Sequence, residues 1–343
     1  MKTTPPQQIE FDVINDAASP GALPAIFARD WPAYQKWIRR SDNTSPDHCT
    51  AELRRHMPEL MPAFDAMLAR LIPHVDNQEE HDEIARFLTL YDPPRLVRAC
   101  SQLVAEGDAG PVLLRTYDHH PDLFDAMVLE SAWGSQRTLA MADCVWGALD
   151  GINADGLAVA LAFGGRNAIG PGFAAPLIVR YLLETCTNVR YAKKALERLP
   201  VYMPYTFVVV DADGSFVTAF LGPDRDPVFV TRRTSTNHQT SPQGGADWPA
   251  YAKQTQSHER LHAMEALVAP PGDLQRARAA FTAPPLWRDD HANASGSLYA
   301  AEYTPADRAL TLRWPTQSQL FKLGSVESGS FIADLRARVA TNS

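Results

Sequence analysis

Hydrophobic residues recur at helical spacing through the first ninety residues of the chain. Apolar positions three and four apart predict an amphipathic helix over 50–72, and Pro58 and Pro62 inside it predict that it is divided or kinked. The same spacing predicts shorter helices over 31–40 and 77–90. This lead segment is therefore expected to be mostly helical.

The pattern changes from helices to strands near residue 99. Short apolar runs now alternate with turns rich in Gly and Asp, which is typical of β-hairpins. The expected hairpins span 100–118, 146–161, 207–220 and 297–314. At the other end, residues 1–20 are polar and contain prolines, which favours an extended or partly disordered start. The change in pattern predicts an α+β fold divided into 1–99 and 100–343.

Composition excludes several classes of protein. The chain has 343 residues, 45% hydrophobic and 21% charged, with a formal net charge of −8. No basic stripe marks a nucleic-acid binder, no apolar run reaches membrane-spanning length, and the N-terminus lacks the apolar stretch of a secretory signal. The four cysteines are widely spaced, which favours neither a disulfide framework nor a cysteine zinc site. A reducing, cytoplasmic location is expected.

One cysteine stands out by its neighbours. Cys100 opens the first expected strand, and Arg115 and Asp118 lie on the strand that should return beside it. A guanidinium close to a thiol favours the thiolate, which is the nucleophilic form. The spacing therefore predicts that Arg115 and Asp118 lie near the sulfur. The alternative is a buried structural cysteine, since free cysteines are commonly buried and inert.

Three further segments that follow Cys100 in the chain are informative about function. The first is Asp150-Gly151-Ile152-Asn153 with Gly156-Leu157-Ala158-Val159, the second is Thr236-Asn237-His238, and the third is Ser257-His258-Glu259-Arg260. Together with Cys100, Arg115 and Asp118 they resemble the cysteine-type N-terminal-nucleophile (Ntn) hydrolases. The resemblance is to the autoproteolytic family that includes acyl-CoA:isopenicillin N acyltransferase, with bile-salt hydrolases as more distant relatives. It runs from about residue 30 to about residue 315.

The resemblance implies a four-layer αββα sandwich with a mostly helical N-terminal pro-segment. It implies self-cleavage between Ala99 and Cys100, after which the thiolate and the new α-amino group act on linear amide bonds through a thioester. By the same resemblance Arg115 and Asp118 would hold the nucleophile's charge and its amine. Asn237 would supply an oxyanion-hole donor and Arg260 would brace the site.

The resemblance also bears on partners. It implies a small-molecule acyl-amide or acyl-donor substrate, no cofactor, no metal, and a cleaved pro-segment that is either released or retained as a second chain. Neither a nucleic acid nor a membrane is expected as a partner, and formation of a homo-oligomer stays open.

Two features of the sequence keep other functions open. Many members of the family have Asn where this chain has Ala162, which leaves room for a non-catalytic Ntn-like protein that binds a ligand. The stretch from His258 through Glu259 to His262 spells His-Glu-x-x-His, the helix of zinc metalloproteases. Two histidines four apart on a helix can share a metal, with the glutamate as base, so a zinc-dependent hydrolase is the second alternative.

Overall fold

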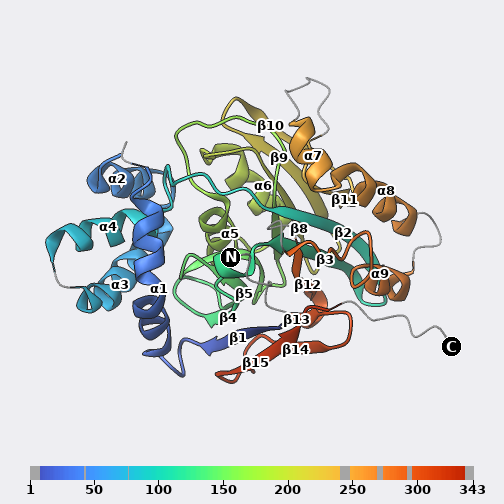
Figure 1. The fold of residues 1–343 in the computed structure, drawn as a ribbon, viewed down its shortest axis with the longest axis horizontal. Coiled ribbons are helices and arrows are strands. Elements are labelled where there is room, and N and C mark those ends of the chain that lie inside the picture. Colours follow the sequence, from blue (N-terminus) through green and yellow to red (C-terminus); the bar gives the residue numbers. More distant parts are fainter. Residues whose placement is uncertain are drawn as a thin grey trace, which may run out of the picture.

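The computed structural model describes residues 8–41, 44–75, 77–239, 248–268, 273–291 and 296–336. In these ranges the strands form two sheets that pack face to face (Figure 1). The nine-stranded sheet has the order β10 (Arg225–Val230), β9 (Phe216–Gly222), β8 (Tyr205–Val210), β7 (Ala158–Phe163), β6 (Gly147–Asn153), β5 (Thr138–Asp143), β4 (Met127–Ser131), β1 (Gln8–Asn15), β15 (Gly329–Asp334). The six-stranded sheet has the order β11 (Thr234–Ser235), β2 (Ala99–Gly107), β3 (Gly110–His119), β12 (Gly296–Thr304), β13 (Ala309–Arg313), β14 (Ser318–Lys322).

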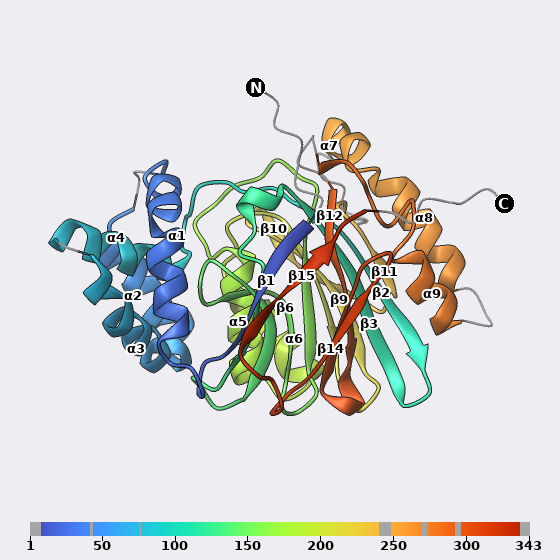
Figure 2. The same ribbon diagram turned by 60° about the horizontal axis from the view of Figure 1, so that its bottom comes forward.

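Helices cover the outer face of each sheet (Figure 2). Two helices, α5 (Ala175–Thr185) and α6 (Val189–Arg198), pack on the nine-stranded sheet. Three others pack on the six-stranded sheet or on one another: α7 (Pro249–Gln254), α8 (Ser257–Val268) and α9 (Leu274–Ala280). The order of layers is helix, sheet, sheet, helix, which confirms the expected αββα sandwich.

The helices of the lead segment form a group at one side of the sandwich (Figure 2). They are α1 (Ala22–Ile38), α2 (Pro46–His56), α3 (Met61–Leu71) and α4 (Gln78–Thr89). The expected break in the longest helix is confirmed, because a 3₁₀ turn at Pro58–Leu60 separates α2 from α3. Side-chain caps at Ser45 and Asn77 begin α2 and α4, as short polar side chains commonly do.

The described start of the chain is extended, which is one of the two expected alternatives, and it is an ordered strand. Residues 8–15 form β1, which pairs in parallel with β4 on one side and antiparallel with β15 on the other. The polar residues 1–7 lie outside the described residues. Apolar Phe11, Val13 and Ile14 of β1 are buried in the core, which therefore includes residues from both sides of position 99. A strand that needs partners from distant segments leaves little local signal.

The C-terminal part of the chain adds an edge strand to each sheet. The predicted hairpin at 297–314 is present as β12 and β13. After this hairpin, β14 continues the six-stranded sheet and β15 pairs with β1. No helix in the described part of the chain combines the length and the apolar character that crossing a membrane requires.

Candidate active site

Cys100 and Arg115 meet across the β2–β3 hairpin. The antiparallel register sets Cys100 opposite Tyr117 and Gln102 opposite Arg115. Because side chains alternate along strands, these four residues share the face toward the nine-stranded sheet. Arg115 donates from Nη2 to the Cys100 sulfur at 2.9 Å. The expected approach of the guanidinium to the thiol is therefore present.

Asp150 holds the other side of the same guanidinium. It lies on β6 and forms an ion pair with Arg115 in which both side chains are fully buried. Its carboxylate also accepts hydrogen bonds from the hydroxyls of Tyr299, at 2.6 Å, and Tyr303. Sequence reasoning assigned Asp150 no role. The available signal was an acidic residue within an otherwise apolar strand, which indicates a buried carboxylate with a partner.

The buried position of Cys100 reverses one electrostatic expectation. The side chain is 0% exposed, and burial raises the pKa of the Cys100 thiol above its usual range. Arg115 acts in the opposite direction and is the largest influence that lowers this pKa. The expectation that the thiolate is favoured does not hold for the uncleaved chain, because desolvation of the charged form outweighs the neighbouring cation.

Asp118 and Arg260 lie on the other face of the same sheet. Asp118 is three positions from Arg115, so the alternation of the strand turns it toward the helices rather than toward the sulfur. There Arg260 contacts Asp118 Oδ2 at 3.3 Å and donates to Ser101 Oγ at 2.8 Å. Ser297 donates to Asp118 Oδ1 at 2.7 Å. Burial raises the pKa of Asp118, and the Arg260 charge opposes this most.

Asn237 links the backbone of Cys100 to Arg260 on the helix-covered face of the sheet. Its Oδ1 accepts from the backbone N–H of Cys100 at 2.8 Å and from Arg260 Nη2 at 2.7 Å. Its Nδ2 donates to the carbonyl oxygens of Arg98 and Phe163, both at 3.2 Å. Asn237 thus binds the chain on both sides of Ala99. In the uncleaved chain its amide N–H groups are already used by these two carbonyls.

A glycine lets the segment that follows β7 pack closely against the backbone of Asn237. Gly165 has a φ of +72°, and a Cβ at this position would lie 2.0 Å from the carbonyl oxygen of Asn237. Only glycine fits both the conformation and the contact. Ala162, the departure from the family pattern, is buried on β7 opposite Thr206. The neighbouring Phe163 backbone supplies a hydrogen bond to Asn237 there.

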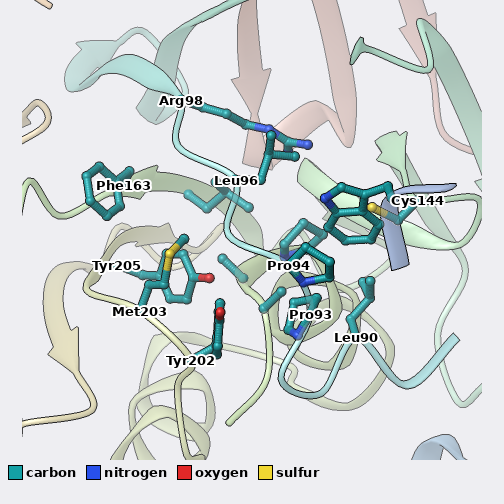
Figure 3. Close-up of a pocket in the computed structure, with 15 residues that line it drawn as sticks. Leu90, Pro93, Pro94, Leu96, Arg98, Cys144, Phe163, Tyr202, Met203 and Tyr205 are labelled. Atoms are coloured by element: carbon teal, nitrogen blue, oxygen red, sulfur yellow. The ribbon is translucent and has the colours of Figure 1, made fainter. Parts of the chain in front are cut away.

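A mainly apolar pocket lies beside the linker that precedes Cys100 (Figure 3). Its volume is about 40 Å³. The linker (residues 93–98) forms one wall, and β7 and the segment 202–205 form others. The labelled lining residues are Leu90, Pro93, Pro94, Leu96, Arg98, Cys144, Phe163, Tyr202, Met203 and Tyr205. An apolar chain would suit this pocket, in which Arg98 is the main charged lining residue.

The histidines of the His-Glu-x-x-His stretch face away from this site. His258 and His262 are exposed on α8, whereas Arg260 between them is buried against Asp118. Among the described residues no three His, Cys, Asp or Glu side chains are grouped so that they could hold a metal ion. The helix therefore presents Arg260, rather than a pair of ligands, to the core.

The four-layer sandwich with a cysteine at the start of a central hairpin is the architecture of a cysteine-type Ntn hydrolase. The family model of acyl-coenzyme A:6-aminopenicillanic acid acyl-transferase matches residues 104–319, which is more than half of the chain. The chain belongs to this family. The matched range begins just after Cys100 and includes Arg115, Asp118, Asn237 and Arg260.

Several solved structures are similar to this chain at low sequence identity. Penicillin V acylase from Agrobacterium tumefaciens has a TM-score of 0.47 and 14% identity, covering 69% of this chain and 92% of that one. A mutant conjugated bile acid hydrolase from Clostridium perfringens has 0.47 and 11%, covering 67% and 96%. The Caenorhabditis elegans ortholog of N-acylethanolamine-hydrolyzing acid amidase has 0.42 and 14%, covering 60% and 93%. No curated protein matches the chain significantly.

Proposed function

We propose that the protein is a self-processing amidohydrolase or acyltransferase whose nucleophile is Cys100. The observation that carries the proposal is the contact of 2.9 Å between Arg115 Nη2 and the Cys100 sulfur, together with the hydrogen bond from the Cys100 N–H to Asn237. The charged Arg115 donates a hydrogen bond to the sulfur, and Asn237 accepts one from the nitrogen of the Ala99–Cys100 peptide bond. These two contacts support cleavage of the bond between Ala99 and Cys100.

The first reaction is cleavage of the chain before Cys100. The sulfur attacks the carbonyl carbon of Ala99, the C–N bond breaks, and the thiol proton ends on the departing nitrogen. The products of this N-to-S shift are a thioester of Ala99 and a free α-amino group on Cys100. Water then hydrolyses the thioester, which gives the Ala99 carboxylic acid and regenerates the thiol. Asn237 Oδ1 accepts from this nitrogen before the shift and remains an acceptor for the amine afterwards.

Cleavage changes the electrostatics of the site in a favourable direction. The carbonyl of Arg98 is no longer tied to Cys100, so Asn237 Nδ2 becomes available to an oxyanion. Access of water reduces the desolvation that raises the Cys100 pKa, and the influence of Arg115 then prevails. The new α-amino group has an ordinary pKa of about 7.7–8.0, which suits a general base near neutral pH.

The mature reaction uses the same atoms on an external substrate. The Cys100 thiolate attacks the acyl carbon of a linear amide and forms a thioester, and the amine leaves with a proton. Water as acceptor gives hydrolysis, and an amine as acceptor gives acyl transfer. The apolar pocket beside the linker supports an acyl group with an apolar portion. Arg260 positions Asn237 and Asp118 without touching the reacting atoms.

The pro-segment stays bound as a second chain after cleavage. Its strand β1 is an internal strand of the nine-stranded sheet, with β4 and β15 as partners. Further contacts across the divide include Tyr181 Oη with Glu59 and the Trp146 indole N–H with the carbonyl of Leu88. Release would expose the apolar residues of β1 to water, which costs free energy in proportion to the area exposed.

Intact-mass measurement of denatured protein tests the proposal. The unprocessed chain has a mass of 37.8 kDa. We expect the wild type to give two fragments, the larger beginning at Cys100, and the Cys100→Ala variant to stay whole. The processed protein is then assayed against a panel of acyl amides. A folded wild type that remains a single chain would overturn self-processing and with it the mechanism based on the α-amino group.

A further inference from the structure

A buried ion pair lies two residues before the proposed nucleophile. Arg98 donates from Nη1 to Asp143 Oδ2 at 2.7 Å, and both side chains are almost fully buried. The guanidinium also lies over the ring of Tyr117, with its carbon 5.5 Å from the ring centroid. Tyr117 is the residue opposite Cys100 in the β2–β3 register. A site for a cation is therefore built next to the sulfur.

Arg98 lines two hollows of the structure. With Cys144 it lines the apolar pocket, where its side chain extends across one side toward Cys144 (Figure 3). Both residues also line a second hollow of about 380 Å³ between α1 and the sandwich, and Asp143 and Asp125 line that hollow too. Arg98 thus lines two hollows although its side chain is almost fully buried.

Cleavage of the chain would change the surroundings of the Arg98–Asp143 ion pair. Arg98 and Ala99 are the acyl portion of the bond that Cys100 attacks, so both become part of a free carboxyl terminus. A buried carboxylate that loses its cation is strongly unfavourable. Arg98 is the cation that pairs with Asp143 among the described residues. Movement of the new carboxyl terminus, with the rest of the pro-segment still bound, would separate Arg98 from Asp143 and leave this carboxylate available to another cation of similar length.

We propose that Asp143 determines specificity for a cationic group on the acyl side of the substrate, and that Arg98 holds this place in the uncleaved chain. The inference rests on the proposed function. The carbonyl of any substrate must reach the same sulfur as the carbonyl of Ala99. A guanidinium or ammonium one residue further along the acyl chain can then reach Asp143 and the face of Tyr117, which attracts cations.

Matched chromogenic amides test this specificity in processed wild-type enzyme. The three probes are the p-nitroanilides of N-acetyl-arginyl-alanine, N-acetyl-citrullyl-alanine and N-acetyl-glutamyl-alanine. Citrulline has nearly the shape of arginine without its charge. We expect kcat/KM to be roughly tenfold or more higher for the arginyl than for the citrullyl probe, because only the former satisfies the buried carboxylate, and lowest for the glutamyl probe.

The Asp143→Asn variant should remove the preference between the arginyl and citrullyl probes. Asp213→Asn is the matched control, since Asp213 is exposed on the turn between β8 and β9, and should retain it. If Asp143→Asn alone does not fold or process, because Arg98 is then unpaired, the double variant Arg98→Gln/Asp143→Asn removes both charges and takes its place.

The outcomes separate this inference from the proposed function. Equal kcat/KM for the arginyl and citrullyl probes in wild type overturns the role of Asp143 and leaves amide hydrolysis standing. So does a processed enzyme that cleaves other acyl amides but none of these three. A chain that neither processes nor hydrolyses any amide overturns the proposed function, and this inference falls with it. An unchanged preference in Asp143→Asn also overturns the assignment.

Discussion

Arg115 has two buried partners of opposite character. One nitrogen contacts the Cys100 sulfur and another pairs with Asp150, whose carboxylate two tyrosine hydroxyls also bind. The charge of the guanidinium is therefore largely balanced before the thiol ionises. Desolvation of the buried thiol is the larger influence, and it raises the pKa of Cys100 despite the neighbouring Arg115.

Replacement of Asp150 tests how much the fold depends on this pair. In Asp150→Asn, Arg115 keeps its buried charge without a counter-ion, and loss of one partner of a buried pair typically costs about 3–5 kcal/mol. We expect the free energy of unfolding to fall by about this amount, measured by urea unfolding in the Cys100→Ala background so that one chain is compared. Asp213→Asn, an exposed change, should alter it by less than about 0.5 kcal/mol. A similar value for both variants would contradict the role given to Asp150.

At the scale of elements, strand alternation distributes the site over two faces. Cys100 and Arg115 face the second sheet, whereas Asp118 faces α8, where Arg260 meets it. The hairpin was predictable from apolar runs and turn residues, and so was the approach of Arg115 to the sulfur. The partner of Asp118 was expected only through resemblance, since α8 lies far along the chain from β3.

Strand β1 links the lead segment to the sandwich. It supplies hydrogen-bonding partners to both β4 and β15, and Phe11 at its centre stacks on Phe331 with ring centroids 5.1 Å apart. The ring of Trp314 lies 5.3 Å away on another side. An internal strand cannot leave a sheet without exposing two rows of backbone groups. The lead segment is thereby held by more than the contacts of its helices.

Removal of the Phe11 side chain should weaken this link. Truncation of a buried phenylalanine to alanine commonly costs about 3–5 kcal/mol. We expect the two fragments of processed Phe11→Ala to separate at a lower urea concentration than those of wild type, measured by co-elution in size-exclusion chromatography. Glu10→Ala changes an exposed residue on the same strand and should leave the transition in place. Co-elution of the Phe11→Ala fragments up to the wild-type concentration would show that β1 does not hold the pro-segment.

At the scale of the whole molecule, a half-buried carboxylate, Asp125, and a buried one, Asp143, lie where the lead segment meets the sandwich. The hydroxyl of Tyr34 on α1 donates to Asp125, and the backbone N–H of Val145 donates to the same carboxylate at 3.2 Å. Burial, with a further contribution from Asp143, raises the pKa of Asp125 to about 7. The protonated form of this carboxyl is therefore favoured in the folded chain over a wide range of pH.

This shift predicts how stability depends on pH. An unfolded Asp titrates near 3.9, so between about pH 4 and about pH 7 the folded state binds more protons at Asp125 than the unfolded state does. Stability from this group is full at the acidic end and is lost as the pH rises through about 7. We expect Asp125→Asn to reduce the fall in Tm between about pH 5 and about pH 8, in the Cys100→Ala background. The exposed change Asp65→Asn should follow the parent. Parallel curves for Asp125→Asn and the parent would exclude this carboxyl as the source.

The local pattern of apolar and turn residues determined much of the secondary structure of this protein. Apolar spacing and turn residues predicted the helical lead, the hairpins and the change near residue 99, because helices and hairpins are set by neighbours in sequence. The same reasoning brought Cys100 and Arg115 together across one hairpin. Only the tertiary structure decided the rest. The strand β1, the support of Arg115 by Asp150, and the pairing of Arg98 with Asp143 all join segments far apart in the chain. Such contacts depend on how the two sheets stack, and that arrangement also sets the burial that raises the pKa of Cys100.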